Sequence, residues 1–250
     1  MIAHFGMYDM PALHGANNRF WKAIRTELGV GPDHLTRTDD PWAVWKSDDL
    51  LISQTCGYPY RAKLHGHVQL VATPDYGLPD CPAGYYNSVL IARLDSNITK
   101  LGDMSGKRFA YNEALSQSGW AAPIMHLEAQ GITPSSLLET GGHAVSAQAV
   151  ADGLADIAGI DALTWTLLEE HAPDLTASLM VVDRTRATPA LPFITALGRD
   201  ADAIRSAMAQ AVEKLSSADR AALHLKGVRE IAAEEYLSIG KPKSPQDLLP

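Results

Sequence analysis

Short apolar segments typical of strands alternate with segments of helical spacing along most of this chain. We expect strands at residues 2–5, 50–54, 68–73, 88–93, 108–110, 156–160, 178–182 and 193–197. We expect helices at residues 17–28, 57–64, 118–130, 146–152, 162–171, 201–215 and 218–225. Strands that alternate with helices generally pair in parallel sheets with helices on both faces. The sequence therefore predicts an α/β protein.

Two extended segments, residues 88–93 and 188–197, divide this alternating pattern. A chain of 250 residues is long enough for one large or two small domains. If both segments connect two lobes, the middle of the chain forms one lobe and the two ends together form the other. The proline-rich tail from Lys241 is expected to be loose. The expected lobes are residues 1–91 with 193–250, and residues 92–192, with a ligand cleft between them.

Charge and hydropathy exclude two classes of partner. The net charge of −8 argues against nucleic acid, because a phosphate backbone demands clustered lysine and arginine. No apolar run reaches the roughly 18 residues of a membrane span, so we expect no direct membrane insertion. The first strand follows the start of the sequence without a basic leader. Either the protein is cytoplasmic, or a leader is missing from this sequence.

The segment from Arg108 to Gly119 has the features of an anion-binding loop. An expected strand is followed by a loop that contains Ser116 and Ser118, and a helix is expected to open near Ser118. A helix N-terminus has unpaired N–H groups and the positive end of the helix dipole. Serines before helices are commonly turn or cap residues. Two hydroxyl groups, a glycine and the strand-to-helix position together favour an anion site.

The order and spacing of several motifs resemble the phosphate, phosphite and phosphonate group of ABC-transporter substrate-binding proteins. The resemblance implies a two-lobed, type 2 periplasmic-binding-protein fold. Each lobe would be a mostly parallel sheet flanked by helices, and two extended hinge strands would join the lobes. The matching motifs extend over roughly residues 1–200 and are Asp49-Leu50-Leu51-Ile52 with Tyr58, residues 84–91, residues 101–108, Ser116-Gln117-Ser118-Gly119, Gly142-His143, and residues 151–156 with Asp161.

The resemblance also implies which residues bind the ligand. The loop Ser116, Gln117, Ser118 and Gly119 corresponds to the family's grip on the phosphonate oxygens, with His143 as a further donor. Around the other end of the ligand lie the positions of Tyr58, Tyr86 and Asp161. Tyr8 and Asp9 are added because they follow the first strand. Asp161 has two equal interpretations, since it could also cap the helix that follows it. Gln117 replaces a residue that is often threonine in the family, so oxyanions other than phosphonate remain candidate ligands.

The function implied by the resemblance is a periplasmic receptor without a cofactor. It would bind a small anion, act as a monomer and deliver its ligand to an ABC permease. The alternative is an enzyme of cofactor biosynthesis, or of other small-molecule chemistry, on the same two-lobed scaffold. In that case Cys56 would be the nucleophile and His143 the base. We favour the receptor, because no set of nucleophile, base and orienting group is visible.

Cysteine and histidine usage bear on the compartment and on metal binding. The two cysteines, Cys56 and Cys81, lie in loop-like contexts. The resemblance to a periplasmic family favours a disulfide between them, whereas two thiols would suit the cytosol. His65 and His67 share one face of an extended segment, and no cysteine or carboxylate cluster completes a tetrahedral set. We expect no metal site.

Overall fold

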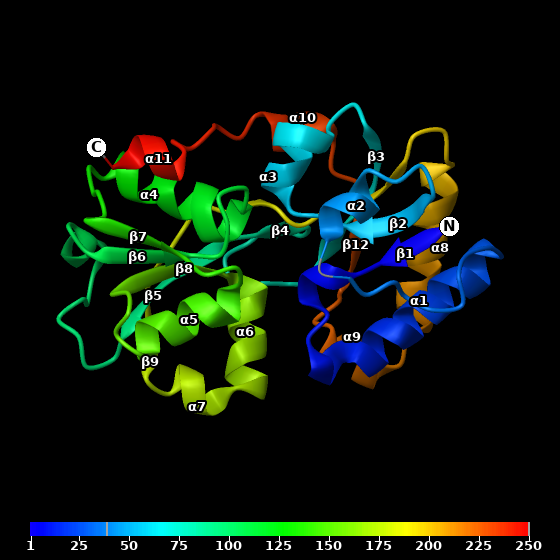
Figure 1. The fold of residues 1–250 in the computed structure, drawn as a ribbon. Helices are drawn as coiled ribbons and strands as arrows, with labels where there is room; N and C mark the ends of the chain where they lie inside the picture. Colours follow the sequence, from blue (N-terminus) through cyan, green and yellow to red (C-terminus); the bar gives the residue numbers. More distant parts are fainter. Residues whose placement is uncertain (39, 250) are drawn as a thin grey trace. The chain divides into compact units, whose positions relative to one another are not determined.

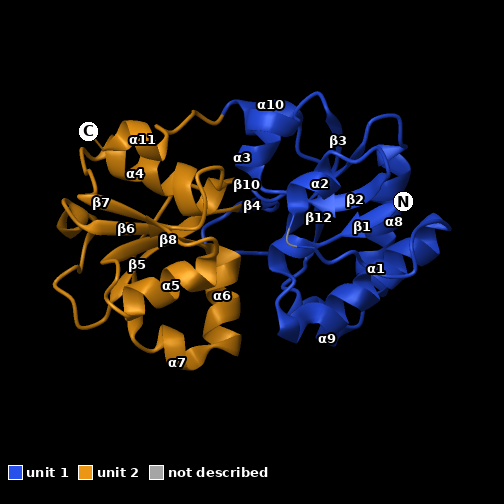
Figure 2. Cartoon of the chain, in the orientation of Figure 1, with its two compact units in different colours: residues 1–85, 189–238 blue, residues 86–188, 239–250 orange. Residues whose placement is uncertain are grey.

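Two units make up the computed structural model, which describes residues 1–38 and 40–249. Unit 1 comprises Met1–Tyr85 and Pro189–Ser238, and unit 2 comprises Tyr86–Thr188 and the chain from Ile239 onward (Figure 2). The chain thus passes between the units three times. Among the described residues, none of the helices has both the length and the apolar character needed to cross a membrane.

The sheet of unit 1 has the strand order β1-β2-β11-β3-β12, of which β1, β2, β3 and β12 are labelled in Figure 1. β1 and β2 are parallel, and β11 lies antiparallel between β2 and β3. β12 is antiparallel to β3. Every residue of β2 is buried, as expected of a central strand covered on both faces. The strand bounds are β1 Ile2–His4, β2 Leu50–Gln54, β3 Val68–Asp75, β11 Phe193–Ala196 and β12 Gly227–Arg229.

The two long helices of unit 1, α1 and α8, each bury an apolar stripe. Phe20, Trp21 and Ile24 of α1 are buried at helical spacing, and the helix ends at Gly29, whose φ of 75° suits a left-handed cap. α1 packs against α8, which lies on β3 and β12. The helix bounds are α1 His14–Leu28, α2 Pro41–Trp45, α3 Gly57–Pro59 with a π-helical continuation Tyr60–Leu64, α8 Ala201–Lys214, α9 Ser217–Ala222 and α10 Ala233–Leu237, besides 3₁₀ turns Gly6–Tyr8 and Pro11–Leu13.

The sheet of unit 2 has the strand order β7-β6-β8-β5-β9. β6 is parallel to β7 and β8, whereas β5 is antiparallel to β8 and β9. The carboxyl ends of β6, β7 and β8 therefore lie at one edge. The strand bounds are β5 Ser88–Arg93, β6 Arg108–Tyr111, β7 Ser136–Glu139, β8 Ile157–Asp161 and β9 Leu179–Arg184; β4 Tyr85–Tyr86 and β10 Thr188–Pro189 form a separate two-stranded sheet.

A helix follows each of β6, β7 and β8, the parallel strands whose carboxyl ends lie at this edge (Figure 1). A π-helical turn, Gln117–Ala121, leads directly into α4, Ala122–Ala129. The core beneath it contains Phe109, Trp120 and Ile157, all of them with no exposed surface. The other helices of unit 2 are the 3₁₀ turn Leu101–Met104, α5 His143–Ala151, α6 Ala162–His171, α7 Pro173–Thr176 and α11 Pro245–Leu248.

The C-terminal segment differs from its expected conformation. The structure forms α11 after Ser244, whose hydroxyl accepts a hydrogen bond from the Asp247 N–H at 3.2 Å. Leu248 of this helix is buried. The segment from Ile239 onward therefore belongs to unit 2 and not, as the expected lobes had it, with the N-terminal end of the chain. The reason is contact with α4 and the turn before it, described below.

Candidate anion-binding site

The candidate site lies at the carboxyl edge of the unit 2 sheet. β6 ends at Tyr111, β7 at Glu139 and β8 at Asp161. In open α/β sheets, ligands bind outside the carboxyl ends of the strands, where the loops lead into helices. Five of the residues predicted for the ligand, namely Ser116, Gln117, Ser118, Gly119 and His143, lie in the loops and first helical turns that follow β6 and β7.

The loop after β6 is polar and yet enclosed. Ser116, Gln117 and Ser118 are only 2%, 1% and 3% exposed. Ser116 has an extended backbone, and its Oγ accepts a hydrogen bond from the Gly119 N–H at 2.9 Å. Its carbonyl accepts a second hydrogen bond from the Ala121 N–H at 2.9 Å. Ser116 is therefore the cap of this helix, and its hydroxyl hydrogen stays available to an acceptor.

Ser118 and His143 form a hydrogen-bonded pair. Ser118 Oγ lies 3.0 Å from His143 Nε2. Burial lowers the pKa of His143 to about 4, against a smaller opposing effect of the Gly159 backbone. The imidazole is therefore neutral at neutral pH. When its Nε2–H donates to Ser118 Oγ, the serine hydroxyl can give its own hydrogen to an oxyanion.

Asn112, which sequence reasoning missed, joins this cluster. A Cβ placed on Gly119 would lie 1.9 Å from Asn112 Oδ1 and 3.2 Å from His143 Cε1, so the Asn112 amide contacts the Gly119 backbone. The backbone carbonyl of Asn112 accepts a hydrogen bond from the Gly141 N–H at 2.8 Å. Asn112 therefore links the loop after β6 to the loop that starts α5. Its position two residues after an expected strand was the available signal.

Two carboxylates, those of Glu113 and Glu139, lie near the carboxyl end of β6. The Tyr111 hydroxyl donates to Glu139 Oε2 at 3.3 Å, and burial followed by the Glu139 charge raises the pKa of Tyr111 to about 12. Burial, with a contribution from Glu139, also raises the pKa of Glu113. Residues 112–119 contain no lysine or arginine. An anion in this loop would therefore be held by neutral donors and helix dipoles.

Asp161 acts as a helix cap in the structure. Its Oδ1 accepts hydrogen bonds from the N–H groups of Leu163 and Thr164 at 2.9 and 3.0 Å, at the start of α6. Its side chain is buried, and its backbone pairs with Ser88 of β5. Tyr86, two residues before Ser88, is 1% exposed. The cap interpretation of Asp161 is thus confirmed, which leaves a ligand contact a prediction.

The remaining predicted residues belong to unit 1 and have contacts of their own there. The Arg61 guanidinium lies over the Tyr58 ring, 4.3 Å from its centroid. The Tyr8 ring packs edge-on against Tyr76 at 5.4 Å. Asp9 is held by Arg37, whose Nε donates to Asp9 Oδ2 at 2.6 Å. These contacts give Asp9 a structural role and leave the two tyrosines as predictions.

The expected disulfide is wrong. Cys56 and Cys81 are separate thiols in the structure. Cys56 follows β2 and Cys81 lies in the loop after β3, and β11 is inserted between these two strands. Strands separated by a third strand lie about 10 Å apart, whereas a disulfide requires Cα atoms within roughly 7 Å. Sequence reasoning placed both loops correctly and could not see the strand between them.

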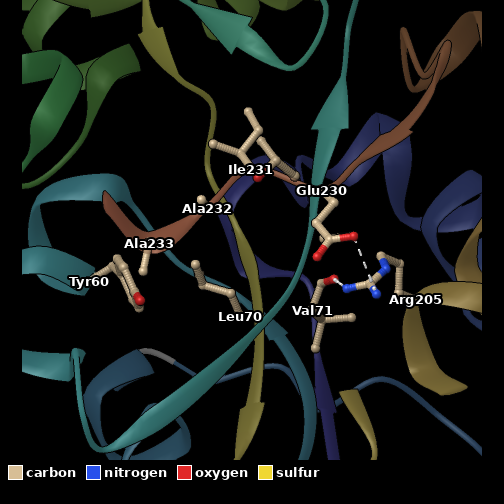
Figure 3. A pocket seen from close by; sticks show the side chains of 10 residues that line it. Tyr60, Leu70, Val71, Arg205, Glu230, Ile231, Ala232 and Ala233 are labelled. Atoms are coloured by element: carbon tan, nitrogen blue, oxygen red, sulfur yellow. Dashed lines mark hydrogen bonds and ion pairs between the residues drawn. The ribbon is translucent and has the colours of Figure 1, made fainter. Parts of the chain in front are cut away.

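A separate cavity of about 530 Å³ lies in unit 1, between β3 and the segment Glu230–Ala233 (Figure 3). Tyr60, Leu70 and Ala233 line one part of it, and Arg205 and Glu230 line another. The Arg205 guanidinium pairs with Glu230 at 3.4 Å and with Asp202, and it donates to the Val71 carbonyl at 3.4 Å. The charged groups of this cavity thus satisfy one another, and no predicted site residue lines it.

The low pKa of His143 predicts a specific pH dependence of stability. An unfolded chain protonates this histidine near pH 6.5, whereas the folded protein resists protonation until about pH 4. Between these values the unfolded state binds more protons, so the free energy of unfolding falls as pH decreases. We expect His143→Gln to remove on the order of 2 kcal/mol of this fall. Urea unfolding at pH 7.0, 5.5 and 4.5 measures it, and identical pH profiles of both proteins would contradict the burial of the imidazole.

Comparison with known proteins bears out the family resemblance. A family model described as the periplasmic phosphonate-binding protein of an ABC transporter matches residues 46–236. No curated protein matches the chain. The structure is similar to a binding protein component of an ABC phosphonate transporter from Pseudomonas aeruginosa, with a TM-score of 0.76 and 19% identity over 95% of this chain and 84% of that chain. It is also similar to PhnD1 from Prochlorococcus marinus in complex with methylphosphonate, with a TM-score of 0.75 and 17% identity over 95% of both chains.

A third solved structure is also similar to this chain and contains a different ligand. XAC2383 from Xanthomonas citri, solved with a chloride ion, has a TM-score of 0.71 and 17% identity over 95% of both chains. At these identities the structures establish the fold, which is that of two-lobed periplasmic binding proteins. The match to the family model covers most of the chain and establishes the family.

Proposed function

Because the chain belongs to the family of periplasmic phosphonate-binding proteins of ABC transporters, we propose that it is a receptor for a small phosphorus oxyanion of the phosphonate or phosphate type. The observation that carries the proposal is the enclosed loop Ser116–Gly119, with Ser118 hydrogen-bonded to His143. Polar side chains are rarely so buried unless their hydrogen bonds are satisfied. An oxyanion would accept the hydrogen bonds that these groups can still donate.

The loop has no positively charged side chain. Two helix N-termini supply a positive electrostatic potential instead. One belongs to the continuous helical stretch formed by the turn Gln117–Ala121 and α4, the other to α5. The N-cap of α5 is Gly142, which has no side chain to occupy the first N–H groups. Neutral donors and helix dipoles are sufficient to bind an anion when they are fixed in place. The same edge can therefore hold an anion next to Glu113 and Glu139.

The choice between phosphonate and phosphate depends on the other end of the ligand. PhnD1, with the same fold, is in complex with methylphosphonate, which supports a phosphonate. Gln117 at the middle of the loop is larger than the threonine common at this position, which supports a compact ligand. The residues proposed for the far end of the ligand are Tyr8 and Tyr58 of unit 1 and Tyr86 and Asp161 of unit 2.

Asp161→Asn should separate the cap from the ligand contact. Asparagine is as good an N-cap as aspartate, so stability should change by no more than a few tenths of a kcal/mol. A simple oxyanion should bind equally well or better, because a carboxylate charge is removed. An aminoalkylphosphonate should bind more weakly, because its ammonium group no longer has the negative charge of the Asp161 carboxylate beside it. Calorimetry with methylphosphonate and aminoethylphosphonate decides this, and equal changes for both ligands would make Asp161 a cap alone.

The receptor is proposed to bind its ligand without transforming it. Cys56, the nucleophile of the alternative, belongs to unit 1, and the Nε2 atom of His143 is hydrogen-bonded to Ser118 within unit 2. The hydrogen bond to Ser118 occupies one imidazole nitrogen of the base that this catalysis would need. As in the family at large, we propose that the protein acts in the periplasm and delivers its ligand to an ABC permease.

A thermal-shift screen tests the proposal. The panel contains phosphate, phosphite, methylphosphonate, aminoethylphosphonate, a sulfonate and acetate. A true ligand at 100 times its dissociation constant stabilises the protein by about 2.7 kcal/mol, which is a shift of several degrees. We expect that shift with at least one phosphorus oxyanion and none with acetate. A shift with acetate or the sulfonate alone would contradict the proposed ligand class. No shift with any phosphorus oxyanion at about 10 mM would contradict the receptor itself.

A further inference from the structure

The C-terminal segment belongs to unit 2 (Figure 2), and it contacts the turn that carries the candidate anion loop. The indole Nε1–H of Trp120 donates a hydrogen bond to the Lys243 carbonyl at 3.0 Å. Trp120 has no exposed surface. It is the next residue after Gly119, in the same π-helical turn that carries Ser118. One hydrogen bond therefore joins the C-terminal segment to the turn that presents the proposed ligand donors.

Two more contacts run along α4, the helix into which this turn leads. Lys243 Nζ pairs with Glu128 Oε1 at 3.0 Å. A Cβ placed on Gly240 would lie 3.0 Å from Met125 Cε, so the backbone there lies close to the α4 side chains. Beyond these contacts, α11 anchors the segment through the buried Leu248. The segment thus contacts both α4 and the turn before it, with polar contacts at 3.0 Å to Trp120 and to Glu128.

The π-helical turn Gln117–Ala121 needs contacts with other parts of unit 2 to keep its conformation. π-helical turns are rare and are found mostly at functional sites. The Trp120 ring lies 4.7 Å from the Tyr111 ring and 6.3 Å from the Phe109 ring, both on β6. These apolar contacts hold the ring against the sheet, whereas the indole N–H must find an acceptor because a buried donor without one is costly. The Lys243 carbonyl is that acceptor, so it fixes how the ring and its turn are seated.

We infer that the C-terminal segment is part of the ligand-binding apparatus, in which Trp120 acts as a positioning residue for Ser118. This inference rests on the proposed function, because it assumes that Ser118 binds the ligand. Trp120 does not itself touch the anion. It holds the turn so that the Ser118 hydroxyl stays 3.0 Å from His143 Nε2 and in reach of an oxyanion. A structural tail would contribute stability alone.

Trp120→Phe tests the inference, because phenylalanine keeps the apolar contacts and removes the indole donor. We expect the affinity for methylphosphonate and for phosphate to fall by about the same factor, roughly three- to tenfold. Trp21→Phe is the matched control. Trp21 is 1% exposed and its Nε1–H also donates to a backbone carbonyl, that of Pro32, at 3.0 Å, but it lies in unit 1. We expect this control to lower the melting temperature and to leave both affinities unchanged.

A second variant guards against a Trp120→Phe protein that does not fold. Leu248→Ala weakens the anchor of α11 and leaves the loop untouched, and we expect a smaller loss of affinity for both anions. Unchanged affinities in both variants, with binding intact in the unsubstituted protein, would overturn the inference and leave the proposed function standing. If the unsubstituted protein binds neither anion, the proposed function fails, and the inference fails with it.

The coupling between anion binding and docking of the C-terminal segment can be measured directly. A segment that only stabilises the fold would not show this coupling. If the docked segment strengthens anion binding, then the anion must strengthen docking by the same factor. Trypsin should cleave after Lys243, which is exposed, but not after Lys241, because Pro242 follows it. We expect saturating methylphosphonate to slow this cleavage severalfold in the unsubstituted protein and much less in Trp120→Phe. An equal effect of the anion on both proteins would contradict the coupling.

Discussion

Anion affinity should fall about 100-fold when Gly119 is replaced by alanine. The new Cβ would lie 1.9 Å from Asn112 Oδ1 and 2.9 Å from Asn112 Cγ, distances that real structures do not allow. The Asn112 side chain must therefore move, although the Asn112 backbone carbonyl is held by the Gly141 N–H, two residues before His143. The same substitution brings a methyl group to 3.2 Å from His143 Cε1. Both halves of the proposed site are displaced together, which is why the loss should exceed that of one hydrogen bond.

Gly102→Ala is the control for this substitution. Gly102 also lies in unit 2, and a Cβ placed on it meets no atom within 4 Å. We expect its affinity to equal that of the unsubstituted protein when both are titrated with methylphosphonate by calorimetry. Full binding by a folded Gly119→Ala protein would place the anion away from the Asn112, Gly119 and His143 cluster.

Ser118→Ala should weaken every anion that the protein binds by about 10- to 100-fold. The substitution removes one hydrogen bond to a charged oxygen and leaves His143 Nε2 without its partner. Since the loss acts on the oxyanion and not on the rest of the ligand, phosphate and methylphosphonate should lose the same factor. Calorimetric titration of both anions measures it.

Ser96→Ala is the matched serine of unit 2 for this experiment. Ser96 Oγ donates to the Arg93 carbonyl at 2.7 Å, at the end of β5. Its replacement should leave both affinities unchanged. A Ser118→Ala protein that binds one anion normally and the other weakly would show that Ser118 recognises a substituent of the ligand.

The part of the fold that follows from local sequence was predicted well. α6 occupies the expected residues, Ala162–His171, because Asp161 caps it and Pro173 stops it. The helix after the loop Ser116–Gly119 begins one residue before its expected start. Strand β6 ends at Tyr111, one residue beyond expectation. These elements carry their own start and stop signals, and so the position of the proposed anion loop could be predicted from the sequence.

Features that depend on contacts distant in sequence could not be predicted. The hydrogen bond from Trp120 to Lys243 joins residues 123 positions apart, and it converts an expected loose tail into part of unit 2. β12 is three residues long, too short for any period to show, and no strand was expected there. The contact between Asn112 and Gly119 depends on the close approach of two loop segments. A glycine with ordinary backbone angles gives no sign of such an approach in the sequence.

The most direct test of the central claim is a crystal structure determined with saturating methylphosphonate. The account predicts a phosphonate oxygen about 3 Å from Ser118 Oγ, with further oxygens facing His143 and the first N–H groups of the turn Gln117–Ala121. A phosphonate bound elsewhere, for example in the unit 1 cavity beside Arg205, with the loop Ser116–Gly119 empty, would contradict it.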